Sequence, residues 1–223
     1  MKKSSSLPIT LKSEVVPSVA IIISFIAGLY FYSHFGPTVI SHWNWHGTPD
    51  GVLPRVYGSF GMPVLILIIY GVFLVLPTLD PRKEQYVSFA RAYHLIKGTV
   101  VLTLLVIFLA TGAYNLGYPI DMGIIIPFVI GIMMILLGRL LGNIRGNWFI
   151  GFRTPWTLSN EKVWKKTNRL GGFMLVIFGA LLIFIPFLPS MLGITAFILG
   201  ILLVVIIPVV YSYILYKEEE KKK

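Results

Sequence analysis

Long apolar stretches alternate with short polar ones along the whole chain. Six such stretches are present, at residues 15–35, 58–79, 95–116, 123–141, 170–188 and 191–216. Each is close to the roughly 17–25 residues that a helix needs to cross the hydrocarbon core of a bilayer. Backbone hydrogen bonding inside lipid favours helices, since barrel strands would be shorter and amphipathic. The pattern predicts an all-α integral membrane protein, a bundle of about six transmembrane helices.

The charged residues indicate how these spans are oriented. Only 13% of the residues are charged, against about 25% in soluble domains. Of the 19 Lys and Arg residues, all but Arg55 fall in or beside the N-terminal segment, the second and fourth connections and the C-terminal tail. Cytoplasmic loops carry such an excess of basic residues, so both termini are expected in the cytoplasm. The formal charge of +10 is then explained by loops that face anionic lipid, and direct nucleic-acid binding is not expected.

The first connection, on the predicted outer side, has its own polar pattern. Residues 48–51 have the sequence of a β-turn, in which Pro49 presets φ at the second position. Trp43 and Trp45 fit the aromatic belt at the membrane interface. We therefore expect a structured outer loop that closes in a turn at residues 48–51.

A metal site in this loop is the weaker interpretation. His42 and His46 are four residues apart, and on a helix they could share a metal ion, with Asp50 as a third ligand. No H-E-x-x-H pattern follows, and a predicted turn lies directly downstream. The chain contains no cysteine, and we expect no cofactor.

The fourth connection, on the predicted inner side, contains a second unusual segment. Ser159 is placed to cap a short helix, with Asn160 and Glu161 in its first turn. That helix would be amphipathic and would lie at the membrane surface. Its apolar face, on lipid, would carry Val163, Trp164, Thr167 and Leu170, and its basic face would carry Lys162, Lys165, Lys166 and Arg169. Lipid anchoring alone and docking of a cytoplasmic protein or nucleotide both remain open.

Both segments resemble parts of a known family. The inner stretch at residues 150–161, followed by Val163-Trp164, Lys166-Thr167 and residues 169–172, resembles the hallmark of the SdpI immunity-protein family. The outer stretch resembles the uncharacterised domain often found at the N-terminus of those proteins, through His42-Trp43-Asn44, Gly47 and Asp50-Gly51. Two positions depart from the family pattern: Ile40 stands where a proline is common, and Asn168 where a histidine is expected.

The resemblance implies a function. The type member of the family crosses the membrane six times, protects a cell from its own secreted toxic peptide, and holds a transcriptional repressor at the membrane when the toxin is present. By resemblance, an extracellular peptide toxin would contact the outer residues His42, Trp43, Asn44, Gly47, Asp50 and Gly51. A cytoplasmic repressor-type protein would contact the inner residues Asn147, Arg153, Thr154, Pro155, Trp156, Asn160, Glu161, Trp164 and Arg169.

These observations combine into one leading hypothesis and two alternatives. We expect an N-terminal membrane module over residues 1–95 and an SdpI-like module over residues 96–223, with a cytoplasmic basic loop at 143–169. The leading hypothesis is a non-enzymatic immunity and signalling protein of the cell membrane, whose partners are the bilayer, the toxin and the regulator. One alternative is a small multi-pass transporter or exporter. The other is a metal-dependent membrane sensor or enzyme built on His42, His46 and Asp50.

Overall fold

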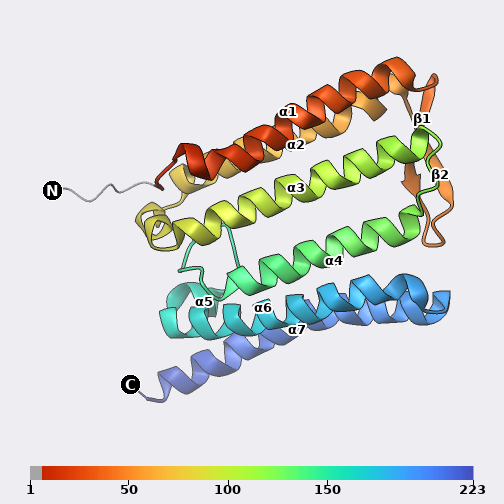
Figure 1. The fold of residues 1–223 in the computed structure, drawn as a ribbon. Coiled ribbons are helices and arrows are strands. Elements are labelled where there is room, and N and C mark those ends of the chain that lie inside the picture. The colour runs from red at the N-terminus through yellow and green to blue at the C-terminus, as the bar shows by residue number, and fades with distance from the viewer. Residues whose placement is uncertain (1–6, 223) are drawn as a thin grey trace.

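A computed structural model describes residues 7–222 as a layer of long helices with a β-hairpin across one end (Figure 1). Within these residues, six helices are long and apolar enough to cross a membrane, which confirms the predicted spans. They are α1 (Leu11–His34), α2 (Arg55–Leu79), α3 (Ala90–Asn115), α4 (Met122–Leu141), α6 (Glu161–Phe184) and α7 (Ser190–Glu220). Lys2, Lys3 and Lys223, which contribute to the predicted charge bias, lie outside the described residues.

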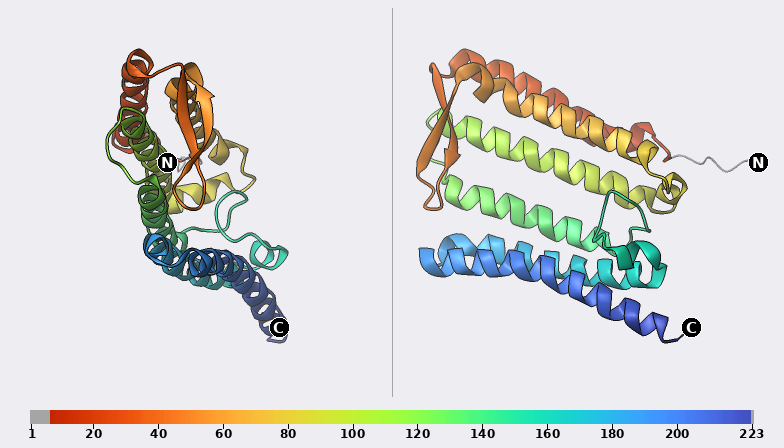
Figure 2. Two further views of the ribbon diagram at one scale, coloured as in Figure 1. Left: turned by 90° about the vertical axis from the view of Figure 1, so that its right-hand side faces the viewer. Right: turned by 180° about the vertical axis from the view of Figure 1, so that it is seen from behind.

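The helices run alternately in opposite directions; α3, α4, α6 and α7 follow one another in a curved row, and α1 and α2 lie side by side next to α3 (Figure 2). α1, α2 and α3 pack on one another, α4 lies between α3 and α6, and α7 packs on α6. The chain thus has a first half, α1 to α3, and a second half, α4 to α7, whose main helix contact is α3 on α4. The predicted module boundary at residue 95 falls within α3, which packs on helices of both halves.

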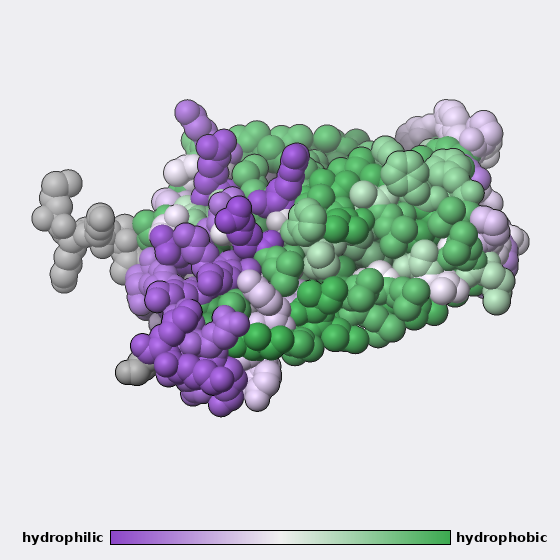
Figure 3. Space-filling model, turned by 90° about the horizontal axis from the view of Figure 1, so that it is seen from below, coloured by the Kyte–Doolittle hydropathy of each residue, from purple (hydrophilic) through white to green (hydrophobic). Residues whose placement is uncertain are grey.

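The two ends of the layer differ in polarity. One end, here called the basic end, contains the start of α1, the α2–α3 and α4–α6 connections and the end of α7. The opposite end, here called the hairpin end, contains the β-hairpin. Figure 3 shows strongly hydrophilic residues gathered at the basic end, weakly polar ones at the hairpin end, and an apolar zone between them. This is the surface of a helical layer that is immersed in lipid along its middle.

Glycines allow α4 and α6 to touch through their backbones. A Cβ added at Gly138 would lie 2.4 Å from the carbonyl oxygen of Gly172, and one at Gly131 would lie 2.5 Å from that of Gly179. In a bilayer, such small residues permit close van der Waals contact between helices. The pairs are seven residues apart on each helix, so the contact runs along about two turns.

The hairpin adds a β element to the predicted all-α fold and corrects the predicted turn. Strand β1 (Thr38–Trp43) pairs antiparallel with β2 (Pro49–Pro54), and His42 faces Gly51. Residues 49–51 belong to β2, so the turn predicted at residues 48–51 is wrong. The chain instead reverses after Asn44, whose Oδ1 accepts the N–H groups of His46 and Thr48. An asparagine side chain can organise a turn in this way, and it outcompetes the signal from Pro49.

The predicted surface helix also needs correction. α6 begins at Glu161 and continues through the fifth span, so no separate amphipathic helix forms there. Its N-cap is Asn160, one residue later than predicted, because a short helix α5 (Pro155–Ser159) occupies the position before it. Val163, Trp164 and Thr167 are buried within the protein, so the face predicted to lie on lipid packs inside the fold.

Candidate functional site

The hairpin presents its polar side chains at the surface of the hairpin end. His42 Nδ1 lies 2.5 Å from Asp50 Oδ1 across the two strands, and both side chains are exposed. Gly51 faces His42, and a Cβ at Gly51 would lie 2.8 Å from the Cβ of His42. The His-Asn and Asp-Gly elements of the outer motif therefore form one cross-strand unit.

Several contacts hold the hairpin on the helices of both halves. The Ile40 N–H donates to Asn115 Oδ1 at the end of α3, and Asn115 Nδ2 donates to the Ile40 carbonyl. A proline at position 40 could not donate the first of these hydrogen bonds. At the tip, Gly47 has φ +73°, and a Cβ there would lie 3.3 Å from the Cα of Gly123 in α4. The Trp45 ring lies 5.5 Å from the Phe197 ring of α7.

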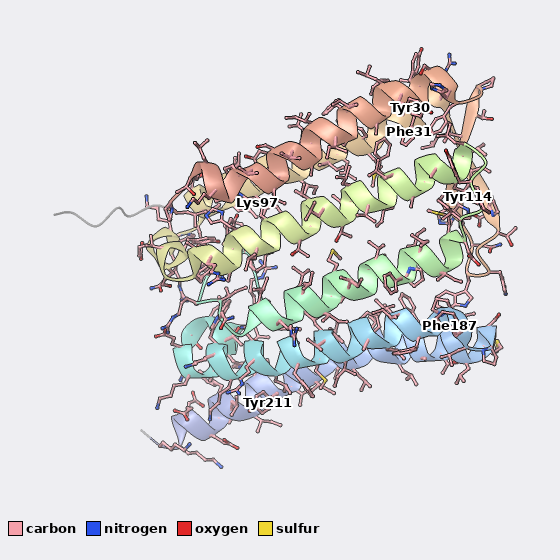
Figure 4. All side chains as sticks on the ribbon, in the orientation of Figure 1. Tyr30, Phe31, Lys97, Tyr114, Phe187 and Tyr211 are labelled. Carbon is pink, nitrogen blue, oxygen red and sulfur yellow. The ribbon has the colours of Figure 1, made fainter. Side chains whose placement is uncertain are left out.

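A cavity of about 430 Å³ lies between the hairpin tip, the start of α4 and the connection from α6 to α7. That connection includes a short helix, η2 (Ile185–Phe187). The hairpin contributes Trp43, Asn44, Trp45 and His46 to the wall. The ring of Trp43 meets Tyr114 of α3 edge-on at 5.2 Å, and Figure 4 shows Tyr114 at this end of the layer. The outer motif thus covers a space between the spans of the second half.

The predicted metal ligands do not come together. His42 is paired with Asp50, whereas His46 lines the cavity. Within residues 7–222, no group of three or more His, Cys, Asp or Glu side chains could hold a metal ion. The three-ligand site built on His42, His46 and Asp50 is therefore not formed.

At the basic end, the connection from α4 to α6, here called the inner loop, is organised by hydrogen bonds to the side chain of Asn147. Its Oδ1 accepts the N–H groups of Phe149 and Ile150, and its Nδ2 donates to the carbonyls of Arg145 and Ile150. Asn147 is fully buried. All of its hydrogen-bonding capacity is used inside the loop, so it positions the loop and does not face a partner.

Other members of the inner motif are buried in the same way. Trp164 Nε1 donates to the Ile144 carbonyl, and the Thr154 hydroxyl lies 3.0 Å from that of Ser212 in α7. Asn168, at the position where a histidine is expected, accepts the Phe152 N–H and donates to the Trp164 carbonyl. These side chains attach the loop to α6 and α7.

The remaining residues of the inner motif form a surface, here called the inner face. It consists of the exposed Arg153, Pro155, Glu161 and Arg169 and the half-buried Trp156. Arg153 Nη1 donates to the Trp148 carbonyl, and the Trp156 ring lies 5.1 Å from that of Tyr213 in α7. Asn160, which caps α6 through the N–H groups of Lys162 and Val163, lies at its edge.

One residue that the sequence analysis did not select holds the inner loop from the other half of the chain. Asp80, at the end of α2, is only 2% exposed. Its carboxylate accepts the N–H groups of Trp148 and Arg82 and the hydroxyl of Tyr86, at 2.8–2.9 Å. The Arg82 side chain then donates to the Leu158 carbonyl. A lone Asp directly after an apolar span was the available signal, but its partner lies 68 positions away.

A buried ion pair was also missed. Lys97, one of the basic residues beside the second connection, lies in α3 with its side chain 1% exposed (Figure 4). Its Nζ is 2.6 Å from both carboxylate oxygens of Glu14 in α1. The Tyr70 hydroxyl of α2 also donates to Glu14, at 2.8 Å. The cluster therefore joins all three helices of the first half.

Segments at both ends of the molecule are similar to known protein families. Residues 143–212, which contain nearly all of the inner loop, match the SdpI/YfhL protein family. The predicted SdpI resemblance is confirmed. Residues 19–67, which contain the hairpin, match a domain of unknown function, DUF1648. The Bacillus subtilis (strain 168) protein "Immunity protein SdpI" is 27% identical over 208 residues, which cover 93% of this chain and 98% of the relative. No solved structure matches the chain.

The SdpI/YfhL segment is completed by residues outside it. Asp80 accepts the Trp148 N–H, and Tyr86 donates its hydroxyl to Asp80; both residues lie between the two matched segments. The chain is a multi-pass membrane protein in which the N-terminal half contacts the SdpI/YfhL segment at both ends: through the hairpin at one and through Asp80 at the other.

Proposed function

We propose that this chain is a non-enzymatic membrane immunity protein that protects its cell from a secreted toxic peptide. The likeness to an immunity protein along nearly the full length of both chains supports this function. The hairpin end would face outward and the basic end the cytoplasm, because every Lys and Arg within residues 7–222 except Arg55 lies toward the basic end. Fusions of a topology reporter at His46 and at Trp156 should then report opposite sides of the membrane.

The observation that carries the proposal is the double connection between the two halves. The hairpin of the first half rests on α4 and α7, and Asp80 of the first half holds the inner loop of the second. A displacement of one half against the other along α3 and α4 would therefore change both ends together. A toxin that binds one arrangement more tightly would shift the population of arrangements and so change the inner face.

The inner face would receive the cytoplasmic regulator. Arg153 and Trp156 belong to residue types that are enriched at protein interfaces, and the exposed Glu161 would suit the polar rim of such an interface. A repressor-type protein is the partner that the family resemblance implies. The buried members of the motif would act only by holding this surface in shape.

A survival and recruitment assay tests the proposal. The chain is expressed in a sensitive bacterial host that is exposed to secreted membrane-active peptides, and survival is scored with and without expression. The variant Arg153→Ala/Trp156→Ala should reach the membrane and lose recruitment of cytoplasmic protein to it. Lys165→Ala, an exposed basic position on α6 outside the inner face, is the control. Unchanged recruitment in the double variant would remove the inner face from the mechanism.

A further inference from the structure

The cavity under the hairpin tip has the size and wall of a binding site. Its volume of about 430 Å³ lies within the usual range of about 300–1,000 Å³ for ligand pockets. Much of the wall is apolar and comes from the first turns of α4, including Ile126 and Pro127, and from Ile185 of η2. Trp45 adds a large ring that is 40% exposed. An apolar ligand group could be buried here at the level of the membrane interface.

One residue of the wall has a polar atom without a partner. Within residues 7–222, Trp43 Nε1 is buried and has no hydrogen-bond acceptor. A buried donor that stays unpaired costs about 1–3 kcal/mol, and Trp N–H groups usually find a partner when they are buried. A ligand with an acceptor oxygen would relieve this cost.

The charges of the wall select among ligands with such an oxygen. Among the described residues no Lys or Arg lines the cavity, whereas Asp121 contributes a carboxylate whose Oδ1 accepts the Gly123 N–H. A lipid phosphate or a free carboxylate would meet this negative charge without a compensating cation. A neutral amide carbonyl would meet the indole N–H without repulsion.

The start of α7 adds further donors. Ser190 lines the cavity, and α7 begins after Pro189 without a side-chain cap. The first N–H groups of a helix have no partner within the helix, so they can donate to an acceptor such as a carbonyl oxygen. The cavity therefore combines apolar walls with N–H donors, while the Asp121 carboxylate disfavours an anionic acceptor.

We infer that this cavity binds a short apolar stretch of polypeptide, whose side chains enter the apolar wall while a backbone carbonyl accepts the Trp43 N–H. This inference rests on the proposed function and identifies its toxin-binding site and the class of ligand. It distinguishes the exposed His42–Asp50 pair, which stabilises the hairpin, from Trp43, which contacts the peptide.

Photolabelling of the full chain in lipid nanodiscs tests this inference. The probe is an acetylated and amidated hexapeptide of alternating Leu and Gly with one Leu replaced by a benzophenone amino acid. It should label residues of the cavity wall, and the unlabelled hexapeptide should displace it. Trp43→Phe keeps the ring and removes the donor, so the apparent affinity should fall about 2- to 10-fold, the equivalent of one hydrogen bond. Ile126→Trp fills the cavity and should abolish labelling of the wall.

The controls separate this site from adventitious binding. Tyr118→Trp adds the same ring at an exposed position of the hairpin end outside the cavity, and it should label like the unchanged chain. A dodecyl benzophenone probe reports lipid binding. Equal labelling by that probe without displacement by the peptide, or equal labelling of the Ile126→Trp and Tyr118→Trp variants, would overturn the inference.

Failure of the site and failure of the function give different results. Protection without peptide labelling would reject the cavity and leave the immunity function standing. Labelling of the cavity without protection in the survival assay would reject the immunity function and leave the site.

Discussion

The polar residues of the two ends differ in what they contact. At the basic end, Asn147, Trp164 and Asn168 are buried and spend their hydrogen bonds on the protein itself. At the hairpin end, His42, Asn44 and Asp50 are exposed. Most residues of the inner motif therefore stabilise the fold of the loop, and only a few of them form an exposed surface. The outer motif lies on a hairpin, which is buried only where it packs on the helices.

The largest predicted difference in unfolding free energy is between the buried Lys97–Glu14 pair and the exposed His42–Asp50 pair. Replacing Lys97 with Met leaves the Glu14 carboxylate partly buried without its cation, and it should cost about 3–5 kcal/mol of unfolding free energy. His42→Gln, in the exposed pair with Asp50, should cost at most about 1 kcal/mol. Thermal unfolding in detergent micelles measures both. A Lys97→Met variant as stable as His42→Gln would show that the buried pair does not hold α1 to α3.

The next difference is between two aspartates. Asp80→Ala removes the acceptor of three donors, two of them backbone N–H groups, and should cost at least about 3 kcal/mol, since hydrogen bonds to a charged group contribute about 1.5–3 each. Asp50→Ala is the matched exposed change and should fall within about 1 kcal/mol. Limited proteolysis should also cut the inner loop near Trp148 in the first variant only. An uncut loop would mean that the remaining contacts suffice to hold it.

Two asparagines provide a smaller and closely matched test. Asn147 and Asn44 each accept two backbone N–H groups through Oδ1. Asn147→Ala should destabilise the protein by about 1–3 kcal/mol because the freed groups are buried. Asn44→Ala should cost less, since water can reach the freed groups. Equal shifts in Tm would contradict the difference in burial on which this comparison rests.

The smallest effect is expected for a glycine of the hairpin. Gly51→Ala places a Cβ 2.8 Å from that of His42 and should cost about 1 kcal/mol, as a local overpacking. Gly36→Ala, where the nearest atom is 4.0 Å away, is the control. Amide hydrogen exchange should accelerate in β1 and β2 in the first variant and not in the second. The same exchange in both variants would indicate that the hairpin accommodates the added methyl group without loosening the strands.

Some expectations from sequence failed because two local signals competed. Pro49 and Gly51 indicated a turn, but the Asn44 side chain closes the reversal earlier and leaves both residues in β2. Ser159 was a good cap by residue type, but the Thr154 cap starts α5 first, so that Asn160 caps α6. In each case the sequence contained more than one residue suited to the turn or the helix cap, and contacts with neighbouring residues decided which of them took that role.

The sequence by itself determined the number of spans, the placement of the two motifs at opposite ends and the family resemblance. A membrane helix must be about 20 apolar residues long with its backbone satisfied internally, so these features are local. Only the tertiary structure decided that Asp80 holds the inner loop, that Lys97 pairs with Glu14, and that the hairpin covers a cavity. Asp80 and Trp148 are 68 positions apart, and Lys97 and Glu14 are 83 positions apart. The cavity is lined by three separate segments. Their partners are chosen by helix packing, which no local pattern specifies.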